Sequence, residues 1–249
     1  MKLAVSTILW KKIHTITELK SILQEIKNIG FEGVGLETRL LPSQVIKDPV
    51  ILKTILKETG FKDCAAYSRI RLDDIDWANF AGIKLLWVVA RGKWTYNSAL
   101  KAVSKIASYA QSLGISIAIH NHLRTIFETE EQLETLLKTN PSINICYDTA
   151  HAEAARIDFR SFISKYGERI ALVHLKDLRK RIPKSKVSIT RDFVNVGEGV
   201  IDFKEILSEL RNVGYNGYVM LETEALGSKE PSFLAKEGYL YVKEILRDI

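Results

Sequence analysis

Four residues of metal-ligand type each end a short apolar run in the second half of the chain. His120 ends SIAIH, Asp148 ends INICYD, His174 ends ALVH and Glu222 ends VMLE. Neutral imidazole and carboxylate oxygen both coordinate manganese, zinc, cobalt and iron, whereas magnesium prefers oxygen donors throughout. Any one of these residues taken alone is more simply a core or rim residue. Four successive runs that end in this way favour one divalent-metal site.

The elements that must bring these residues together are repeated strand–helix units. Helical patterns end in a glycine that is followed by an apolar residue and a β-rich run, and glycine fits the left-handed position past a helix C-terminus. These glycines are Gly30, Gly60, Gly82, Gly114 and Gly214. Helix starts with capping-box spacing occur at Thr15 with Glu18, Thr129 with Gln132 and Asp202 with Glu205. Strands are expected near 3–7, 33–37, 63–67, 84–90, 115–120, 143–148, 170–175 and 217–222.

Eight such units without a Pro-, Gly- or Ser-rich linker predict a single (β/α)8 TIM barrel that spans residues 1–249 as one domain. Several strands, such as KLLWVVA, are continuous apolar runs, as expected for a parallel sheet that is covered on both faces. The C-terminal strand ends of a barrel share one face, so the side chains at 120, 148, 174 and 222 are expected to converge there. Glu37, at the end of the second strand, is expected on the same face, as a substrate-facing acid or as a rim residue.

The composition describes a globular protein of 249 residues, of which 46% are hydrophobic and 27% charged. No apolar stretch approaches the ~20 residues that span a bilayer, and the first residues return to charge too soon for a secretory signal. We therefore expect a cytoplasmic protein without a membrane partner. Cys64 and Cys146 lie in apolar runs and are expected to be reduced core thiols.

The net charge of +6 has two interpretations, a polyanionic partner or a surplus that serves solubility, and the second is the more common. The charge is concentrated in the segment 176–199, which has few apolar residues and predicts a long exposed loop after the seventh strand. Loops of this length in a compact domain are usually functional. Its basic residues between 179 and 191 are expected to be solvated, with a bound sugar phosphate as the alternative.

Four segments, CYDTAH, VHLKD, VGEGVIDFKEIL and GYNGYVMLETE, resemble the second half of the xylose isomerase-like TIM-barrel superfamily, the sugar phosphate isomerase/epimerase family. Sugar epimerases, hydroxypyruvate isomerase, inosose dehydratase and abasic-site endonucleases belong to that superfamily. The resemblance covers strands five to eight in order and spacing, and strands one to four in general pattern. It implies one divalent metal held by His120, Asp148, His174 and Glu222. It also implies that His151, three residues after Asp148, contacts substrate.

The fifth strand departs from the commoner pattern of this superfamily. Many members end it in glutamate, where this chain has His120. Epimerases of the superfamily use that glutamate and the strand-eight glutamate as a pair of bases, and only Glu222 remains here. Epimerisation would therefore need Glu37, His122 or His151 as the second base. The short H-x-H run of His120 and His122, with Thr125 after it, is similar to the inosose dehydratase branch, which eliminates water after removing an α-proton.

The leading hypothesis is a metal-dependent sugar or sugar phosphate isomerase or epimerase that acts on a small polyhydroxy carbonyl substrate through a metal-stabilised enediolate. Glu222 would be a metal ligand and a base, and the further predicted site residues are His151, Glu37, His122, Lys176 and Trp10. Lys176 has an equally weighted alternative, an ion pair with Asp177 that pins the loop after strand seven. For Trp10, packing against a helix is favoured over a place in the pocket wall.

Three other hypotheses stay open. A dehydratase on the same site is the nearest in mechanism. An abasic-site endonuclease-like nuclease is disfavoured, because the chain has five histidines and none between His14 and His120, which is too few for the metal cluster that the resemblance would require. Nucleic acid is thus not the expected partner. The third hypothesis is a non-catalytic sugar-binding barrel. A homo-oligomer is compatible with the sequence, which leaves the oligomeric state open.

Overall fold

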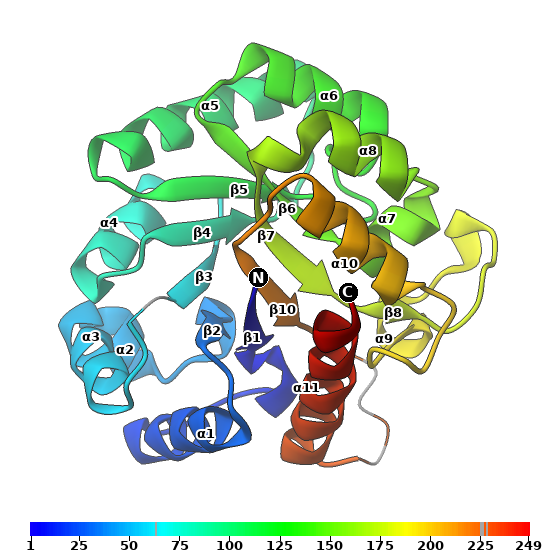
Figure 1. Cartoon of the computed structure of the whole chain (residues 1–249). Coiled ribbons are helices and arrows are strands. Elements are labelled where there is room, and N and C mark those ends of the chain that lie inside the picture. The colour runs from blue at the N-terminus through cyan, green and yellow to red at the C-terminus, as the bar shows by residue number, and fades with distance from the viewer. Residues whose placement is uncertain (63, 225–226, 228) are drawn as a thin grey trace.

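A closed barrel of parallel strands forms the centre of the computed structural model, which describes residues 1–62, 64–224, 227 and 229–249. Helices surround the strands on the outside (Figure 1). The strands follow one another around the barrel in the order β1-β10-β7-β6-β5-β4-β3-β2, and every pairing is parallel. They are β1 Lys2–Ser6, β2 Gly33–Leu36, β3 Cys64–Ser68, β4 Leu85–Val88, β5 Ser116–His120, β6 Ile143–Asp148, β7 Ile170–Leu175 and β10 Tyr218–Leu221. The predicted (β/α)8 barrel is confirmed.

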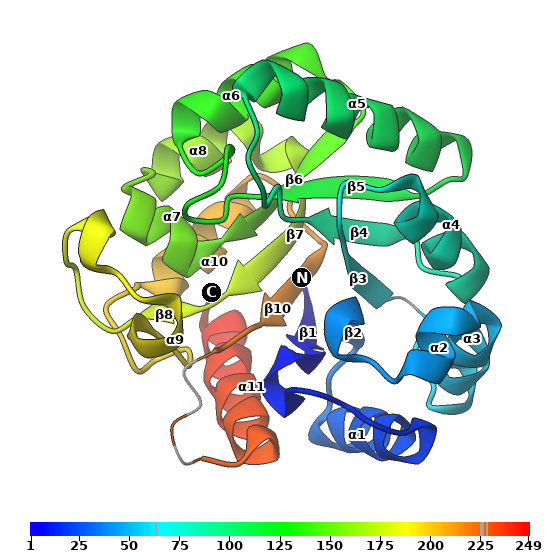
Figure 2. The ribbon, with the colours of Figure 1, turned by 180° about the vertical axis from the view of Figure 1, so that it is seen from behind.

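The helices begin and end close to the predicted positions. The α-helices are α1 Ile16–Ile29, α2 Ser43–Lys47, α3 Pro49–Glu58, α4 Leu72–Ala81, α5 Tyr96–Ser112, α6 Glu130–Thr139, α7 Thr149–Ala155, α8 Phe159–Tyr166, α9 Ile189–Asp192, α10 Phe203–Asn212 and α11 Pro231–Asp248. Short 3₁₀ turns are η1 Thr7–Trp10, η2 Thr38–Leu40, η3 Gly167–Arg169 and η4 Lys184–Lys186. The ring closes where α11 lies beside α1 and β10 pairs with β1 (Figures 1 and 2).

The predicted helix caps are present. The side chains of Thr15, Thr129 and Asp202 each accept a hydrogen bond from the backbone N–H three residues later. All five predicted terminal glycines have positive φ angles. At Gly30, where φ is 117°, a Cβ atom would lie 2.5 Å from Oη of Tyr239 on α11, so only glycine fits between the two helices.

Alternate strand residues point into the barrel and fill it. The interior cluster consists of Ala4, Ala65, Tyr67, Trp87, Val89, Ala118, Cys146, Leu172 and Met220. Gly35 leaves room for this filling, since a Cβ atom there would lie 2.3 Å from Sδ of Met220. Side chains in a strand repeat with a period of two, so the residue two positions after each interior residue also points inward, but nearer to the mouth.

The segment after β7 is only partly the exposed loop that its charge predicts. Its two ends form a short antiparallel pair, β8 Asp177–Leu178 with β9 Phe193–Val194. Phe193, Val194 and Val187 are buried, while η4 and α9 form the outer part (Figure 2). The prediction of an exposed loop was therefore wrong for the base of this segment, because a few apolar side chains among many charges are enough to anchor it.

The remaining expectations concern the start of the third strand, membrane spans, the two cysteines, the number of domains and the location. Asp63, the first residue of the predicted third strand, lies outside the described residues. Within the described part of the chain, no helix combines the length and the apolar character needed to cross a bilayer. Neither Cys64 nor Cys146 forms a disulfide, and Cys146 is fully buried. The assignment of residues 1–249 to one domain and the cytoplasmic location stay predictions.

Candidate metal centre

The four side chains predicted to converge lie together at the mouth of the barrel. One donor atom from each of His120, Asp148, His174 and Glu222 lies within 4.8 Å of those from the other three, and all four residues are buried. The period of two explains the convergence, because each follows an interior residue by two positions: Ala118, Cys146, Leu172 and Met220 respectively. The strand pattern therefore places His120 and Asp148 at the last residue of a strand, His174 one residue before the end of β7, and Glu222 directly after β10.

The donor atoms of this cluster face one another and have few other partners. Nε2 of His120 lies 3.4 Å from Oδ2 of Asp148, and Nδ1 of His174 lies 3.3 Å from Oε2 of Glu222. Among the described residues, no hydrogen bond reaches Oδ2 of Asp148, Oε2 of Glu222 or either ring nitrogen of His174. Buried polar atoms are rarely left in this state. Two imidazoles and two carboxylates with unsatisfied, inward-facing donor atoms fit a divalent ion.

Neighbouring backbone groups fix the orientation of the Asp148 ligand. Its Oδ1 accepts the backbone N–H of His151 at 2.9 Å, so Asp148 is the N-cap of α7 and presents Oδ2 to the cluster. Asn121 bridges β5 and β6, because its amide group both donates to the carbonyl of Asp148 and accepts the N–H of that residue, at 3.1 and 2.7 Å. The edge of Trp87 packs on the ring of His174, with centroids 5.3 Å apart.

Lys176 is fully buried and contacts three carboxylates. Its Nζ lies 2.8 Å from Oε1 of Glu222, 2.9 Å from Oε1 of Glu224 and 3.3 Å from Oδ2 of Asp148. Burial lowers the pKa of Lys176, but the three carboxylates outweigh it and raise the pKa well above its usual value. With every acid ionised, these groups carry a net charge of two minus, which one divalent cation would balance.

Lys176 and Asp177 do not form the ion pair that the sequence left open, because their side chains turn to different partners. The buried carboxylate of Asp177 accepts the backbone N–H groups of Leu178, Gly197, Gly199 and Ile201 at 2.8–3.1 Å. Asp177 thus holds the two ends of the segment after β7 together through the backbone. The ion-pair alternative for Lys176 was therefore wrong, and the loop is held by hydrogen bonds from backbone N–H groups to Asp177.

The two predicted histidines beside the cluster are held in defined tautomers. Nε2 of His122 lies 2.9 Å from the Arg91 guanidinium, which can only donate, so Nδ1 of His122 carries the proton and donates to the Leu123 carbonyl. Burial lowers the pKa of His122 to about 3. Nδ1 of His151 accepts the N–H of Leu123, so the proton of this ring lies on Nε2, which is buried and has no hydrogen-bond partner among the described residues.

The remaining predicted site residues lie on the opposite half of the mouth or away from it. Glu37 is 2% exposed, and its Oε1 accepts the Arg39 Nε–H at 2.8 Å. Burial raises the pKa of Glu37. The indole N–H of Trp10 points to Oε2 of Glu25 on α1 at 3.4 Å, so Trp10 packs against that helix, as the favoured alternative predicted.

Two charged residues at the site were not predicted. Glu224 shares Lys176 with Glu222, and burial raises its pKa to about 7. Arg91 contacts His122 and has no carboxylate partner among the described residues. Both had a signal in the sequence, since Glu224 continues the period of two from Glu222 and Arg91 directly follows the apolar run of the fourth strand.

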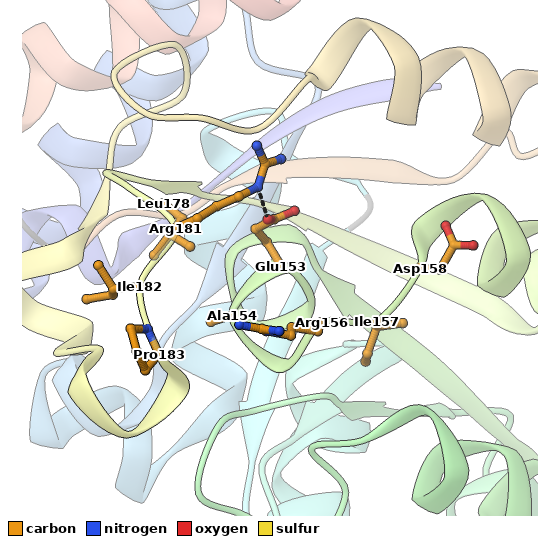
Figure 3. Close-up of a pocket in the computed structure, with 9 residues that line it drawn as sticks. All are labelled: Glu153, Ala154, Arg156, Ile157, Asp158, Leu178, Arg181, Ile182 and Pro183. Carbon is orange, nitrogen blue, oxygen red and sulfur yellow. Dashed lines mark hydrogen bonds and ion pairs between the residues drawn. The ribbon is translucent and has the colours of Figure 1, made fainter.

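A cavity of about 390 Å³ lies outside the cluster, between α7 and the segment 178–183 (Figure 3). Arg181, one of its lining residues, pairs with Glu153 of α7 at 2.6 Å. Other basic residues of the run 179–191 are also neutralised, because Lys184 pairs with Glu128 and Arg191 with Asp192, both at 2.7 Å. None of the residues that line this cavity belongs to the metal cluster.

Known proteins share both the sequence pattern and the fold. Residues 69–245 match the family model described as xylose isomerase-like TIM barrel. An inosose dehydratase of Geobacillus kaustophilus is 31% identical over 140 residues, which cover 52% of this chain and 46% of that protein. The chain therefore spans about half the length of the curated relatives it matches.

Two solved structures have the same fold over nearly their whole length. The structure of L-ribulose 3-epimerase has a TM-score of 0.80 and 16% identity, with 99% of this chain and 95% of that chain covered. The IOLI protein with a bound zinc atom has a TM-score of 0.78 and 19% identity, with 97% and 98% covered. With a family match across more than two thirds of its residues, this chain belongs to the xylose isomerase-like TIM barrel family.

Proposed function

We propose that this protein is a metal-dependent dehydratase that eliminates water from a small polyhydroxy carbonyl compound. His120, Asp148, His174 and Glu222 would hold one divalent ion, of zinc, manganese, cobalt or iron type, because two of the four donors are nitrogens. Such an ion polarises a substrate carbonyl and stabilises the negative charge that develops when the neighbouring proton is removed. The similarity to inosose dehydratases supports the elimination reaction.

One observation carries the choice of elimination, namely that, among the described residues, none of the three predicted substitutes is free to act as a second base opposite Glu222. Both ring nitrogens of His122 are engaged, His151 has its free nitrogen protonated, and Glu37 is bound by Arg39. Epimerisation needs a base on each face of the substrate carbon, whereas a syn elimination needs only one. The three substitutes that would restore epimerisation are each committed to another contact.

In this elimination a single carboxylate both removes the proton and returns it. Oε1 of Glu222, the carboxylate oxygen that contacts Lys176 and is not the one turned to the ligand cluster, takes the proton next to the carbonyl. The electron pair of that C–H bond forms the new carbon–carbon double bond as the β-hydroxyl leaves. Glu222 then returns the proton to the departing hydroxide, which forms water and regenerates the carboxylate.

Two further residues orient the substrate in this scheme. The unpartnered Nε2–H of His151 donates a hydrogen bond to a substrate oxygen, and it lies beside the cluster because its ring centroid is 5.1 Å from that of His120. Lys176 holds Glu222 in place and supplies N–H donors on the same side of the mouth. For these roles His151 must be neutral and Lys176 must be protonated, which are the states that their contacts impose.

An isomerase or epimerase, the leading hypothesis from the sequence, is the second candidate. The observation in its favour is Glu37, a buried carboxylate at the mouth, whose pKa is raised first by burial and also by the negative charge of Glu222. Release of Arg39 from Glu37 on substrate binding would supply the missing base. The likeness to L-ribulose 3-epimerase shows the fold alone and does not separate the two reactions.

The test is the fate of a ketosugar in heavy water. Metal-loaded protein is incubated with a keto-inositol and, separately, with ketopentoses, and the products are analysed by mass spectrometry. We expect loss of one water from the keto-inositol and no epimer of the ketopentoses. Glu222→Gln should stop the reaction, with metal content measured in parallel, while Glu58→Gln, an exposed glutamate of α3, should not. Epimerised ketopentose without loss of water from any substrate would overturn the dehydratase in favour of the second candidate.

A further inference from the structure

A second cavity, of about 500 Å³, adjoins the barrel mouth on the side of the first three strands. It lies among η2, α2, α4 and the end of β3, which are neighbours in both views (Figures 1 and 2). Leu41, Ile46, Tyr67 and Trp77 form its apolar walls. The indole N–H of Trp77 donates to the Val45 carbonyl at 3.1 Å, which fixes that wall in place. The volume is typical of small-molecule sites.

Direct contacts connect this cavity to the metal cluster. The guanidinium of Arg39 lies 4.4 Å above the ring of Tyr67, and the Tyr67 ring meets Trp87 edge-on at 6.4 Å. Trp87 in turn packs on His174, a member of the cluster. Two aromatic side chains, Tyr67 and Trp87, thus lie between Arg39 at the cavity and His174 in the cluster.

The cavity carries cations that the protein does not neutralise. Its lining includes Lys12, Arg39, Lys47 and Arg69 against two acids, Asp73 and Asp74. The acids are engaged, because Arg69 chelates Asp74 and Arg71 pairs with Asp73. Among the described residues, Lys12 and Lys47 have no carboxylate partner. Lys12 Nζ donates to the carbonyls of Arg39 and Leu41, at 3.4 and 3.2 Å, which orients its ammonium at the cavity edge.

The other basic region of the chain does not compete for this role. In the run 179–191, Arg181, Lys184 and Arg191 each have an acidic partner. The two lysines of the cavity that lack a carboxylate partner, Lys12 and Lys47, thus lie over the first strands, on the other side of the mouth from the acidic cluster that would hold the metal.

We propose that this cavity binds an anionic group at the far end of the substrate, so that the natural substrate is a sugar acid or a sugar phosphate instead of a neutral polyol. The proposal rests on the proposed function, since it names the substrate class of that same site. Lys12 and Lys47 supply the charge, and Tyr67 and Trp77 cover the carbon chain. Phosphate and carboxylate share this chemistry, and the experiment separates them.

The experiment compares three six-carbon probes that lack a ketone or aldehyde group and therefore cannot react: sorbitol, gluconate and sorbitol 6-phosphate. Each is titrated calorimetrically into the full, metal-loaded chain. We expect at least one anionic probe to bind about tenfold or more tightly than sorbitol, with an affinity that falls as salt rises. Preference for sorbitol 6-phosphate assigns a phosphate, and preference for gluconate assigns a carboxylate.

Variants locate the effect. Lys12→Met with Lys47→Met should reduce binding of the preferred anion about tenfold and leave sorbitol unchanged, whereas Lys20→Met, an exposed lysine on α1, should change neither. If the double variant fails to fold, Lys47→Glu alone serves, because Lys47 is exposed at the end of α2. Equal binding of all three probes, or full affinity in the folded variants, would overturn the proposal.

Failure of this inference can be told apart from failure of the proposed function. Dehydration of a neutral keto-inositol that depends on Glu222, without any anion preference, would refute the inference alone. Anion preference that depends on Lys47, without loss of water from any ketosugar, would refute the dehydratase alone.

Discussion

The stability of the metal-free protein should depend on one buried ammonium group. Lys176 is the only cation within 4 Å of Asp148, Glu222 and Glu224 among the described residues, if the imidazoles are neutral. Lys176→Met keeps most of the length of the side chain and removes its charge, which leaves three buried carboxylates that repel one another. Breaking a buried ion pair by removing one partner costs about 3–5 kcal/mol. For a protein of this size, that loss corresponds to a fall in Tm of roughly 6–20 °C.

A divalent ion should rescue much of this loss, because it supplies the missing positive charge. The assay is urea unfolding of wild type and Lys176→Met, each in chelator and in saturating zinc. We expect the free-energy difference between the two proteins to be smaller with zinc. Lys20→Met is the matched control, since Lys20 and Glu58 are 45% and 51% exposed and such pairs contribute at most about 1 kcal/mol. A loss below about 1 kcal/mol in chelator, or a larger loss with zinc, would refute the charge balance.

Three other substitutions test the fold around the site. Gly30→Ala should lower the unfolding free energy by about 1–3 kcal/mol in urea titrations, because its new methyl group meets Tyr239; Tyr239→Phe should soften the effect, and an unchanged midpoint would contradict the contact. Asp177→Asn should lower the unfolding free energy by about 2–4 kcal/mol, since two of the four N–H groups that donate to Asp177 lose their acceptor. Hydrogen exchange at residues 197–201 should become faster, whereas a variant that keeps the Asp177 carboxylate should show no such change. Arg191 holds the pKa of Asp192 at about 2, below its unfolded value, so this carboxylate stabilises the fold above about pH 4 and the contribution disappears as the pH falls toward 2. The difference in unfolding free energy between wild type and Asp192→Asn, followed by circular dichroism, should become smaller over that interval. A constant difference would disprove the assignment.

The barrel and the convergence of the four ligands could be predicted because both depend on local patterns. A period of two within each strand fixes which side chains point inward, and parallel strands bring their C-terminal ends to one face. His120 and Glu222 could thus be placed together although a hundred residues separate them in sequence. The same reasoning overextended β4 to residue 90, because Val89 and Ala90 are apolar and buried beyond the end of the strand at Val88.

What the sequence did not predict depends on contacts between distant segments. The partners of Lys176 lie on β6 and after β10, and nothing in the run VHLKD indicates whether its lysine turns to them or to Asp177. The tautomer of His122 depends on Arg91, which follows a different strand. The cavity near Trp77 combines three separate segments. Such choices are made by packing, which a single sequence does not encode in its local periodicity.

The hydrogen bonds of Asp177 separate the segment after β7 into a fixed base and an outer part, residues 180–191, that can be replaced. The two ends of this outer part meet at Arg179, whose N–H donates to the Asp192 carbonyl at 2.8 Å. A stretch of different length or composition between these two residues would change the surface that a substrate meets at the barrel mouth. The side chains of the candidate metal site would keep their positions. Evolution or an engineer can thus graft new specificities onto this barrel by exchanging about a dozen residues, without rebuilding its chemistry.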